Sequence, residues 1–517
     1  MPKIIISDRD YTAAAGNIST DYGVFVPGLA GVGATNPPQV AKEYRSLAAF
    51  VADVGKSPQV IGSNFTDMGY MYAAELLGAG LPVVYKCVPN LVTTLAEQTD
   101  TPTVTTASPS GTVRTATATL TKDVANNTEP GSTDFFGTGL IDFLDESGDV
   151  INLVATDMVF TVTVNSSKLL TVTETYGGTG SPSFLDLSAI KSIRYKYEPE
   201  GYIDPNEVTY EAICNEILAD ANFFTEVEDR GLYDISFVTT GGYPTTWKSS
   251  TDGQRKNVIN KLVDVCASRG DCFALIDFEE SMQLKFEDGV YEDANGDQLT
   301  EVNINTVPQD AFIIHPWCQF TPTYSGVTNA FMFPGSFAFL RAFAGSIKSN
   351  NSWFATAGVR RGAVPCTGVS QVITTAEADQ MQPTTGRSVN DIIYIKPYGY
   401  TIYGNRTLFD NKDGLVANSF INVRQLVHEI KRNVYVICKG LMFDPNDDIL
   451  WVNFKNAVTP LLEKMRSGQG IKSFRLVKIQ SSARGTMTAK IIIVPIEAVE
   501  TFDITVELTD EDIAVVG

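Results

Sequence analysis

Residues 420–447, FINVRQLVHEIKRNVYVICKGLMFDPND, decide how the C-terminal third of this chain is organised. Apolar residues recur there every three or four positions, which predicts an amphipathic helix ending at Gly440. A second helical pattern follows at residues 446–468, with acidic residues at its start and glycine at its end. Strand-like runs lie on its C-terminal side, at residues 474–481, 485–496 and 499–508. We therefore predict a compact α+β module over residues 351–496.

Charge is unevenly distributed along the chain. Residues 424–490 contain 12 Lys/Arg and 5 Asp/Glu, whereas the whole chain has a net charge of −21. The acidic total argues against nucleic acid as a partner, because phosphate binding needs a basic footprint. Arg424 and, about two turns further along the first helix, Lys431 and Arg432 are candidates for a basic face toward an acidic partner. The alternative is that they are ordinary solvated charges, paired along the helix surface.

Upstream of the module the pattern changes twice. Residues 21–90 and 200–350 alternate apolar strands with helical patterns, which predicts an α/β domain with a partly parallel sheet. Between them, residues 91–199 carry period-two runs rich in Thr and Val, with 12 Thr between Thr93 and Thr121. These runs predict an inserted antiparallel β domain. A Thr-rich disordered linker is the alternative for residues 93–130.

The two ends of the chain are short, apolar and prone to β structure. Residues 1–20 are either a disordered end or an arm that pairs as a strand elsewhere. The candidate pairing residues in this N-terminal arm are Lys3, Ile4, Ile5 and Ile6. Residues 497–517 form a second candidate arm, which carries 7 acidic and no basic residues. Its candidate pairing residues are Phe502, Ile504 and Val506.

Catalytic and ligand-binding motifs are scarce in the sequence. Gly28, Gly31 and Gly33 follow a strand, but their spacing is G-x-x-G-x-G and no helix start follows, which argues against a dinucleotide loop. Residues 291–301 resemble a calcium loop but lack the carboxylates at its two ends, so an Asn-Gly hairpin turn is favoured. The sequence has only 2 His, no nucleophile motif, and no His spaced with a carboxylate or Cys as metal ligands are. We therefore expect that the protein is not an enzyme and that it binds no cofactor.

The seven cysteines and the start of the chain indicate where the protein is made. The cysteines are odd in number, form no C-x-x-C and sit mostly in apolar runs, which indicates free thiols in a reducing compartment. Residues 1–10 show no apolar signal region, and no run approaches the length of a membrane span. We therefore expect assembly in a cytoplasm and no direct membrane insertion.

Several motifs resemble those of contractile tail sheath proteins from tailed bacteriophages and related injection machines. In the C-terminal third the matching stretches are SWFATAGVRRGAV (352–364), GYTIYGNRTLF (399–409), FINVRQL (420–426), FDPND (443–447) followed by Trp451, and IIIVPIEAVETFDITVEL (491–508). Weaker matches lie upstream, at AAELLGAGLPVVYKCV (73–88) and IIHPW (313–317). Gln425, Phe443 and residues 381–382 depart from the usual family pattern, and the Thr-rich insertion matches nothing.

The resemblance implies a structural subunit rather than an enzyme. Sheath subunits stack as hexameric rings in a helical polymer around an inner tail tube, and contraction drives the tube through the host envelope. The resemblance further implies an inward, tube-facing C-terminal module, an outward inserted domain and terminal strands donated to neighbouring subunits. Expected partners are other copies of the chain, the tube protein, and baseplate and tail terminator proteins. The expected location is a virion tail assembled in the host bacterial cytoplasm.

Two other hypotheses remain open at this point. One is a different self-assembling ring or surface-lattice protein. The other is a ligand-binding α/β enzyme built on residues 200–350, which the lack of a nucleophile, metal or phosphate motif disfavours.

Overall fold

The computed structural model describes residues 22–61, 65–88, 96–127, 130–155, 157–198, 213, 216–217, 220, 222–242, 253–299, 302, 304–479 and 486–498. The chain divides into two compact units. Unit 1 comprises residues 1–60, 66–89 and 209–517, and unit 2 comprises residues 61–65 and 90–208.

An eight-stranded sheet forms the centre of unit 1. Its strand order is β2 (Lys42–Tyr44), β5 (Val83–Cys87), β1 (Gly23–Gly28), β13 (Ile235–Val238), β14 (Phe273–Ile276), β17 (Ala311–His315), β21 (Asn390–Ile395) and β22 (Gly399–Tyr403). Neighbours from β5 to β21 run parallel, and the two outermost strands are antiparallel. Strands β1, β5, β13, β14 and β17 are buried along their whole length, which explains their nearly continuous apolar sequences.

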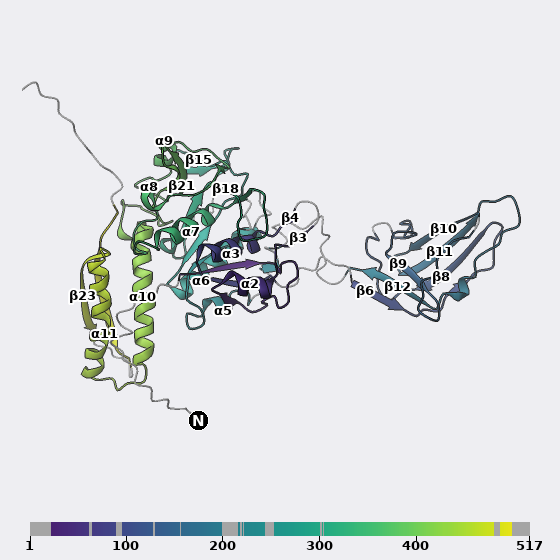
Figure 1. The fold of residues 1–517 in the computed structure, drawn as a ribbon, viewed down its shortest axis with the longest axis horizontal. Coiled ribbons are helices and arrows are strands. Elements are labelled where there is room, and N and C mark those ends of the chain that lie inside the picture. Colours follow the sequence, from purple (N-terminus) through teal and green to yellow (C-terminus); the bar gives the residue numbers. More distant parts are fainter. Residues whose placement is uncertain are drawn as a thin grey trace, which may run out of the picture. The chain divides into compact units, whose positions relative to one another are not determined.

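Helices cover this sheet at positions that the glycine stops in the sequence predict. Helix α2 (Leu47–Val54) ends at Gly55 and α3 (Met68–Ala79) ends at Gly80 in the left-handed conformation. Helices α3 and α7 (Gly335–Ser346) pack on each other and on the sheet, and α6 (Gly253–Arg269) packs on β14 (Figure 1). The shorter helices are α5 (Thr225–Glu228), α8 (Gly358–Arg361) and α9 (Thr375–Gln380).

Small sheets and single turns complete the elements outside the main sheet. A three-stranded sheet has the order β19 (Phe331–Phe333), β18 (Cys318–Phe320), β20 (Gly368–Val369). The other short elements are β3 (Val60–Ile61) with β4 (Phe65–Thr66), β15 (Lys285–Glu287) with β16 (Val290–Glu292), and the single turns η1 (Leu187–Ala189), η3 (Pro308–Asp310) and η4 (Ala417–Ser419). The expected single strand over AFIIHPWCQF is two strands, because Pro316, which cannot donate to a ladder, separates β17 from β18.

The expected boundary at residue 350 does not separate two units. Strands β21 and β22 lie beyond it in sequence, yet they complete the central sheet beside β17. The last part of the chain does have a core of its own. Helices α10 (Ile421–Leu441) and α11 (Asp448–Ser467) enclose it with the hairpin β23 (Ile471–Ile479) and β24 (Thr488–Pro495) (Figure 1). We call these four elements the C-terminal module from here on.

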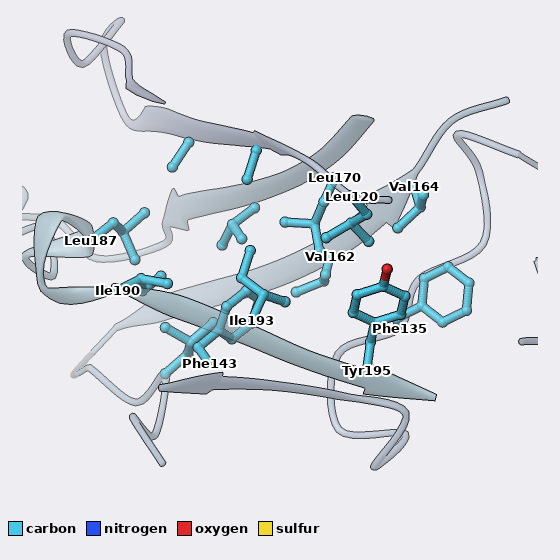
Figure 2. Close-up of a cluster of buried hydrophobic side chains, with 14 of the residues drawn as sticks. Leu120, Phe135, Phe143, Val162, Val164, Leu170, Leu187, Ile190, Ile193 and Tyr195 are labelled. Carbon is cyan, nitrogen blue, oxygen red and sulfur yellow. The ribbon is translucent and has the colours of Figure 1, made fainter. Parts of the chain in front are cut away.

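Unit 2 is a sandwich of two antiparallel sheets. One has the order β10 (Met158–Val164), β11 (Leu169–Tyr176), β8 (Val113–Thr119), β7 (Thr105–Thr106), and the other β6 (Ala96–Asp100), β12 (Ser192–Tyr197), β9 (Ile141–Leu144). Figure 2 shows Val162 and Leu170 of the first sheet meeting Ile193 and Tyr195 of the second. In β8, Ala116 and Ala118 are buried between half-exposed Thr residues, so the period-two pattern of this Thr-rich run belongs to a strand rather than a disordered linker.

Candidate functional site

The C-terminal module is a helical pair covered on one side by a two-stranded hairpin. Its core contains Leu426 and Ile430 of α10, Phe454 and four further residues of α11, and Ile471 of β23. A two-stranded hairpin is only marginally stable alone in water. The apolar face of α11 therefore supports β23 and β24, whose inward side chains Phe474, Leu476, Ala489, Ile491 and Ile493 pack against this core.

Trp353 fixes the turn between α11 and β23, although it lies far upstream in sequence. Its indole Nε1 donates a hydrogen bond of 2.9 Å to the carbonyl oxygen of Gly468. A Cβ on Gly468 would lie 2.8 Å from this ring, and one on Gly470 would lie 3.0 Å from Nε1. Larger residues at either glycine would displace the tryptophan, so the SWF motif serves to seat the hairpin on the module.

The GNRTL motif joins the edge of the central sheet to α10. The Asn405 amide donates to Asn422 Oδ1 at 2.7 Å, and the Asn422 backbone N–H donates to Asn405 Oδ1 at 3.3 Å. Asn422 lies in the first turn of α10, where backbone N–H groups have no partner within the helix. Asn390 of β21 donates to the Arg406 carbonyl at 2.8 Å and accepts from its N–H at 2.7 Å. The motif therefore fixes where the C-terminal module begins.

The three residues proposed as a basic face do not form one. Arg424 is 8% exposed and binds Asp310 Oδ1 through Nε at 2.9 Å and Nη2 at 2.5 Å. Arg432 is buried and donates to Ser236 Oγ, while exposed Lys431 donates to the Gly270 carbonyl at 2.7 Å.

These contacts lie at one edge of the central sheet. Asp310 and Gly270 precede β17 and β14, and Ser236 is near the start of β13. The basic side chains therefore hold α10 across the amino ends of three neighbouring parallel strands.

His428 belongs to the same cluster. Its Nε2 lies 2.8 Å from Asp310 Oδ1, and burial lowers its pKa to about 4 although Asp310 opposes the shift. Above about pH 4, Asp310 thus accepts from the Arg424 guanidinium and from a neutral imidazole in a site closed to solvent. The sequence around Asp310, PQD before an apolar strand, does not predict that this carboxylate binds Arg424 and His428.

A second buried contact ties the start of the described chain to α10. Tyr22 is buried, its ring lies edge-on to Phe343 at 5.3 Å, and its hydroxyl donates to Glu429 Oε1 at 3.1 Å. The Arg432 guanidinium lies 5.8 Å from the Tyr22 ring centroid. Tyr22, the first described residue, is therefore fixed on α10.

Glu429 gives this contact a pH dependence. Burial raises its pKa from 4.5 to about 7, against the lowering effect of Arg432. Because the folded state holds this proton more tightly, the free energy of unfolding falls as pH rises from 4.5 to about 7. His428, whose pKa is lowered, acts in the opposite direction over its own window.

Replacing Glu429 with glutamine isolates its contribution. We expect the unfolding free energy of Glu429→Gln, relative to the unaltered chain, to increase by up to about 3 kcal/mol from about pH 5 to about pH 8. Chemical denaturation followed by tryptophan fluorescence at both pH values measures the difference. An offset between the two proteins that does not change with pH would contradict a buried, titrating Glu429.

The outer face of the hairpin is exposed, and its two outer edges are unpaired among the described residues. The side chains on this face include exposed Arg475, Lys490, Ile492 and Val494. Each strand pairs only with the other within the described part of the chain, so both outer edges present backbone groups to solvent or to another chain. The hairpin is thus a candidate acceptor for an added strand.

The turn between α10 and α11 carries further exposed apolar residues. Phe443 is 99% exposed and has φ of 73°, in the left-handed region that bulky residues rarely adopt. Met442 beside it, Val436 on α10, and Ile449 and Val452 on α11 are also exposed. Several large exposed apolar side chains so close together in the sequence favour a contact surface at this end of the two helices.

The proposed arm residues lie outside the described part of the chain. This applies to Lys3, Ile4, Ile5 and Ile6 at one end and to Phe502, Ile504 and Val506 at the other. Their pairing remains an expectation from sequence.

The two segments whose sequences resemble ligand-binding loops are held by contacts within the protein. A Cβ on Gly28 would lie 2.0 Å from the Tyr85 hydroxyl, so this glycine makes room for a side chain rather than for a phosphate. Asp293 Oδ1 accepts from the backbone N–H groups of Asn295 and Asp297 at 2.8 and 3.0 Å, which forms the expected hairpin turn. No group of three or more His, Cys, Asp or Glu in the described residues could hold a metal ion. None of the described helices is long and apolar enough to cross a bilayer.

Comparison with known proteins assigns the fold. No protein-family model matches the chain. The tail sheath protein of Vibrio phage KVP40 is 23% identical over 190 residues, a match that covers 35% of this chain and only 27% of that relative. The helical sheath of the anti-feeding prophage in its contracted state matches 99% of both chains, with 12% identity and a TM-score of 0.50.

The chain has the fold of a contractile sheath protein. A partial match, to the sheath complex of the extracellular contractile injection system PVC in its contracted state, covers 56% of this chain and 74% of that one, with 19% identity and a TM-score of 0.41. Within this sheath fold, the SWF and GNRTL motifs build the junctions of the C-terminal module.

Proposed function

We propose that this chain is the structural subunit of a contractile tail sheath. In this proposal it polymerises as stacked hexameric rings around an inner tail tube, and its contraction drives the tube through the host cell envelope. The observation that carries the proposal is the match, over 99% of both chains, to a helical sheath. The similarity to a phage tail sheath protein supports a location in the virion tail.

Exchanged terminal strands would hold the polymer together. The open edges of β23 and β24 suit an added strand, and exposed Lys472, Arg475, Lys478 and Lys490 suit the acidic segment 497–517. A strand of five or six residues forms only a few backbone hydrogen bonds, each contributing about 1 kcal/mol net. One exchanged strand is therefore weak, and repetition over many subunits makes the lattice strong.

The same proposal also assigns a side of the polymer to the C-terminal module and to unit 2. The C-terminal module faces the tube and the unit 2 sandwich faces outward, with baseplate and tail terminator proteins at the two ends of the polymer. Assembly takes place in the host bacterial cytoplasm. The exposed apolar residues around Phe443 would be covered by neighbouring subunits in such a lattice.

Negative-stain electron microscopy of the purified protein tests this function. We expect tubes of uniform diameter with a helical repeat, at concentrations where lattice contacts form. Flat lattices or isolated rings would favour a different self-assembling protein. A monomer that gains thermal stability with nucleotides or metal ions would favour the ligand-binding alternative.

A further inference from the structure

The C-terminal module has a hydrophobic core of its own. Of the buried residues in this core that the structure describes, only Trp353 comes from outside α10, α11 and β23. Helix α11 makes its main contacts with α10 and β23, and β23 makes its main contacts with α11 and β24. The module is therefore joined to the rest of unit 1 mainly through α10.

Helix α10 is buried on two faces of opposite character. Leu426 and Ile430 belong to the module core. The other buried side chains of α10 from residue 424 onward are all polar or charged, namely Arg424, Gln425, His428, Glu429, Arg432 and Asn433. Positions 425, 429 and 432 lie on one face of the helix because they are four and three residues apart. This face points away from the module core, since Glu429 binds Tyr22 and Arg432 binds Ser236. We call the contact of this face and of Arg424 and His428 with the rest of unit 1 the polar seam.

The polar seam is incompletely hydrogen-bonded. Within the described part of the chain, several of its buried atoms have no hydrogen-bond partner: Gln425 Oε1 and Nε2, His428 Nδ1, Glu429 Oε2, and Arg432 Nε and Nη2. Such atoms have lost their hydrogen bonds to water and gained none in exchange. Pairing between buried charges does little more than offset their desolvation. The seam therefore contributes much less to stability than an apolar face of similar size would.

We propose that the C-terminal module undocks from the central sheet along the polar seam, as an intact unit, before unit 1 unfolds. Opening the seam returns its polar groups to water and leaves the hydrophobic core of the module buried, so this opening costs less free energy than unfolding either part.

The first turn of α10 is the hinge of this motion. Ile421 and Val423 are buried there, and Asn422 is bonded to Asn405 at the edge of the central sheet. Trp353 lies beside the same turn, where its carbonyl oxygen accepts from the Asn422 amide at 3.5 Å. The apolar attachments and the link through Trp353 are thus concentrated at one end of the helix, and the seam extends from there along α10.

Undocking leaves the hairpin as it is. Strands β23 and β24 pair with each other and rest on α11, so both outer edges keep their geometry when the seam opens. A strand bound at either edge could keep its hydrogen bonds while the central sheet changes orientation. This consequence rests on the proposed function, whereas the undocking itself does not.

Cysteine labelling of the full-length subunit, kept at concentrations below those that give polymers, tests the proposal. Three buried positions are compared: a thiol placed in the seam by Gln425→Cys, a thiol placed in the module core by Val458→Cys, and the native Cys87 of β5. Gln425→Cys removes no hydrogen bond of the seam, and Val458→Cys exchanges two small apolar side chains. A thiol-alkylating reagent is added in native buffer. Each labelling rate is measured by peptide mass spectrometry and divided by the rate in denaturant.

The three rates distinguish undocking from unfolding. We expect the thiol at residue 425 to react at least about tenfold faster than the thiols at residues 458 and 87. Equal rates at all three positions would show that the seam opens only when unit 1 unfolds. Equal rates at residues 425 and 458, both faster than at residue 87, would show that the module unfolds instead of undocking intact. Either result overturns the proposal.

Weakening the seam gives a second readout. Asp310→Ala, combined with each introduced thiol, should accelerate labelling at residue 425 by about a hundredfold or more and leave labelling at residue 458 unchanged. The matched control Glu463→Ala, at an exposed ion pair of α11, should change neither rate. Equal acceleration at both positions would contradict a separate seam. All rates are measured on unpolymerised subunits, so the outcome is independent of whether the protein forms a sheath.

Discussion

Replacing Asp310 with alanine is expected to lower the free energy of unfolding of unit 1 by about 3–5 kcal/mol. The carboxylate is buried and satisfies Arg424 at two nitrogen atoms and His428 at one. Its removal leaves a guanidinium in a site closed to solvent, and the desolvation of that cation is no longer offset. Because Asp310 precedes β17 and Arg424 lies on α10, the loss would also loosen the C-terminal module from the central sheet.

Denaturant titration followed by tryptophan fluorescence measures this effect. All 4 Trp, at positions 247, 317, 353 and 451, belong to unit 1, so the signal does not mix the two units. The matched control is Glu463→Ala on α11, which removes an exposed ion pair with Arg466 and should change stability by less than about 1 kcal/mol.

A second variant shows whether the effect comes from the unpaired cation. Combining Arg424→Met with Asp310→Ala removes the buried guanidinium that has lost its carboxylate partner. The double variant should therefore regain part of the lost stability. A loss for Asp310→Ala no larger than that of the surface control would show that the buried pair does not hold α10 in place.

Deleting residues 1–16 is expected to abolish polymerisation while leaving a folded subunit. The deletion leaves Tyr22 and its contacts with Glu429 and Phe343 in place, so we expect the described fold to be preserved. What is lost is the apolar segment Ile4–Ile6, which we propose pairs with a neighbouring subunit. Without one of its exchanged strands each subunit loses a link that recurs at every lattice position, so the effect on the polymer is large.

Sedimentation and electron microscopy measure the loss of polymer, and circular dichroism with tryptophan fluorescence checks the fold. Two variants of unchanged length refine the result. Replacing Ile4, Ile5 and Ile6 with serine should abolish polymerisation as the deletion does. Replacing Ser7, Asp8 and Arg9 with alanine should still allow tubes to form. Normal tubes from the truncated chain would rule out this arm as a connector.

Much of the local structure could be predicted from the sequence. The 3.6-residue pattern gave α10 and α11 nearly to their ends, and glycine stops located the ends of α2 and α3. The period-two Thr and Val runs predicted the strands of unit 2, and the continuous apolar runs predicted a parallel sheet. These features are set by neighbours a few residues away, through helix and strand periodicity and backbone preferences.

The fate of individual charged side chains could not be predicted in the same way. Arg424, Lys431 and Arg432 share a stripe on α10, and the sequence could not distinguish a solvent-facing stripe from one that faces the sheet. The partner of Arg424 lies 114 residues away and that of Arg432 lies 196 residues away. The boundary at residue 350 was wrong for a related reason, since β21 pairs with β17 across a long stretch of sequence.

The sequence by itself therefore determined much of the local helix and strand structure, including the period-two strands of unit 2, and the resemblance to sheath proteins. Only the tertiary structure decided that the basic residues of α10 anchor this helix to the central sheet, and that Tyr22 meets Glu429 across 407 residues. The physical reason is that periodicity and capping depend on local contacts. The burial and ionisation of a side chain depend instead on which distant residues the fold brings to it.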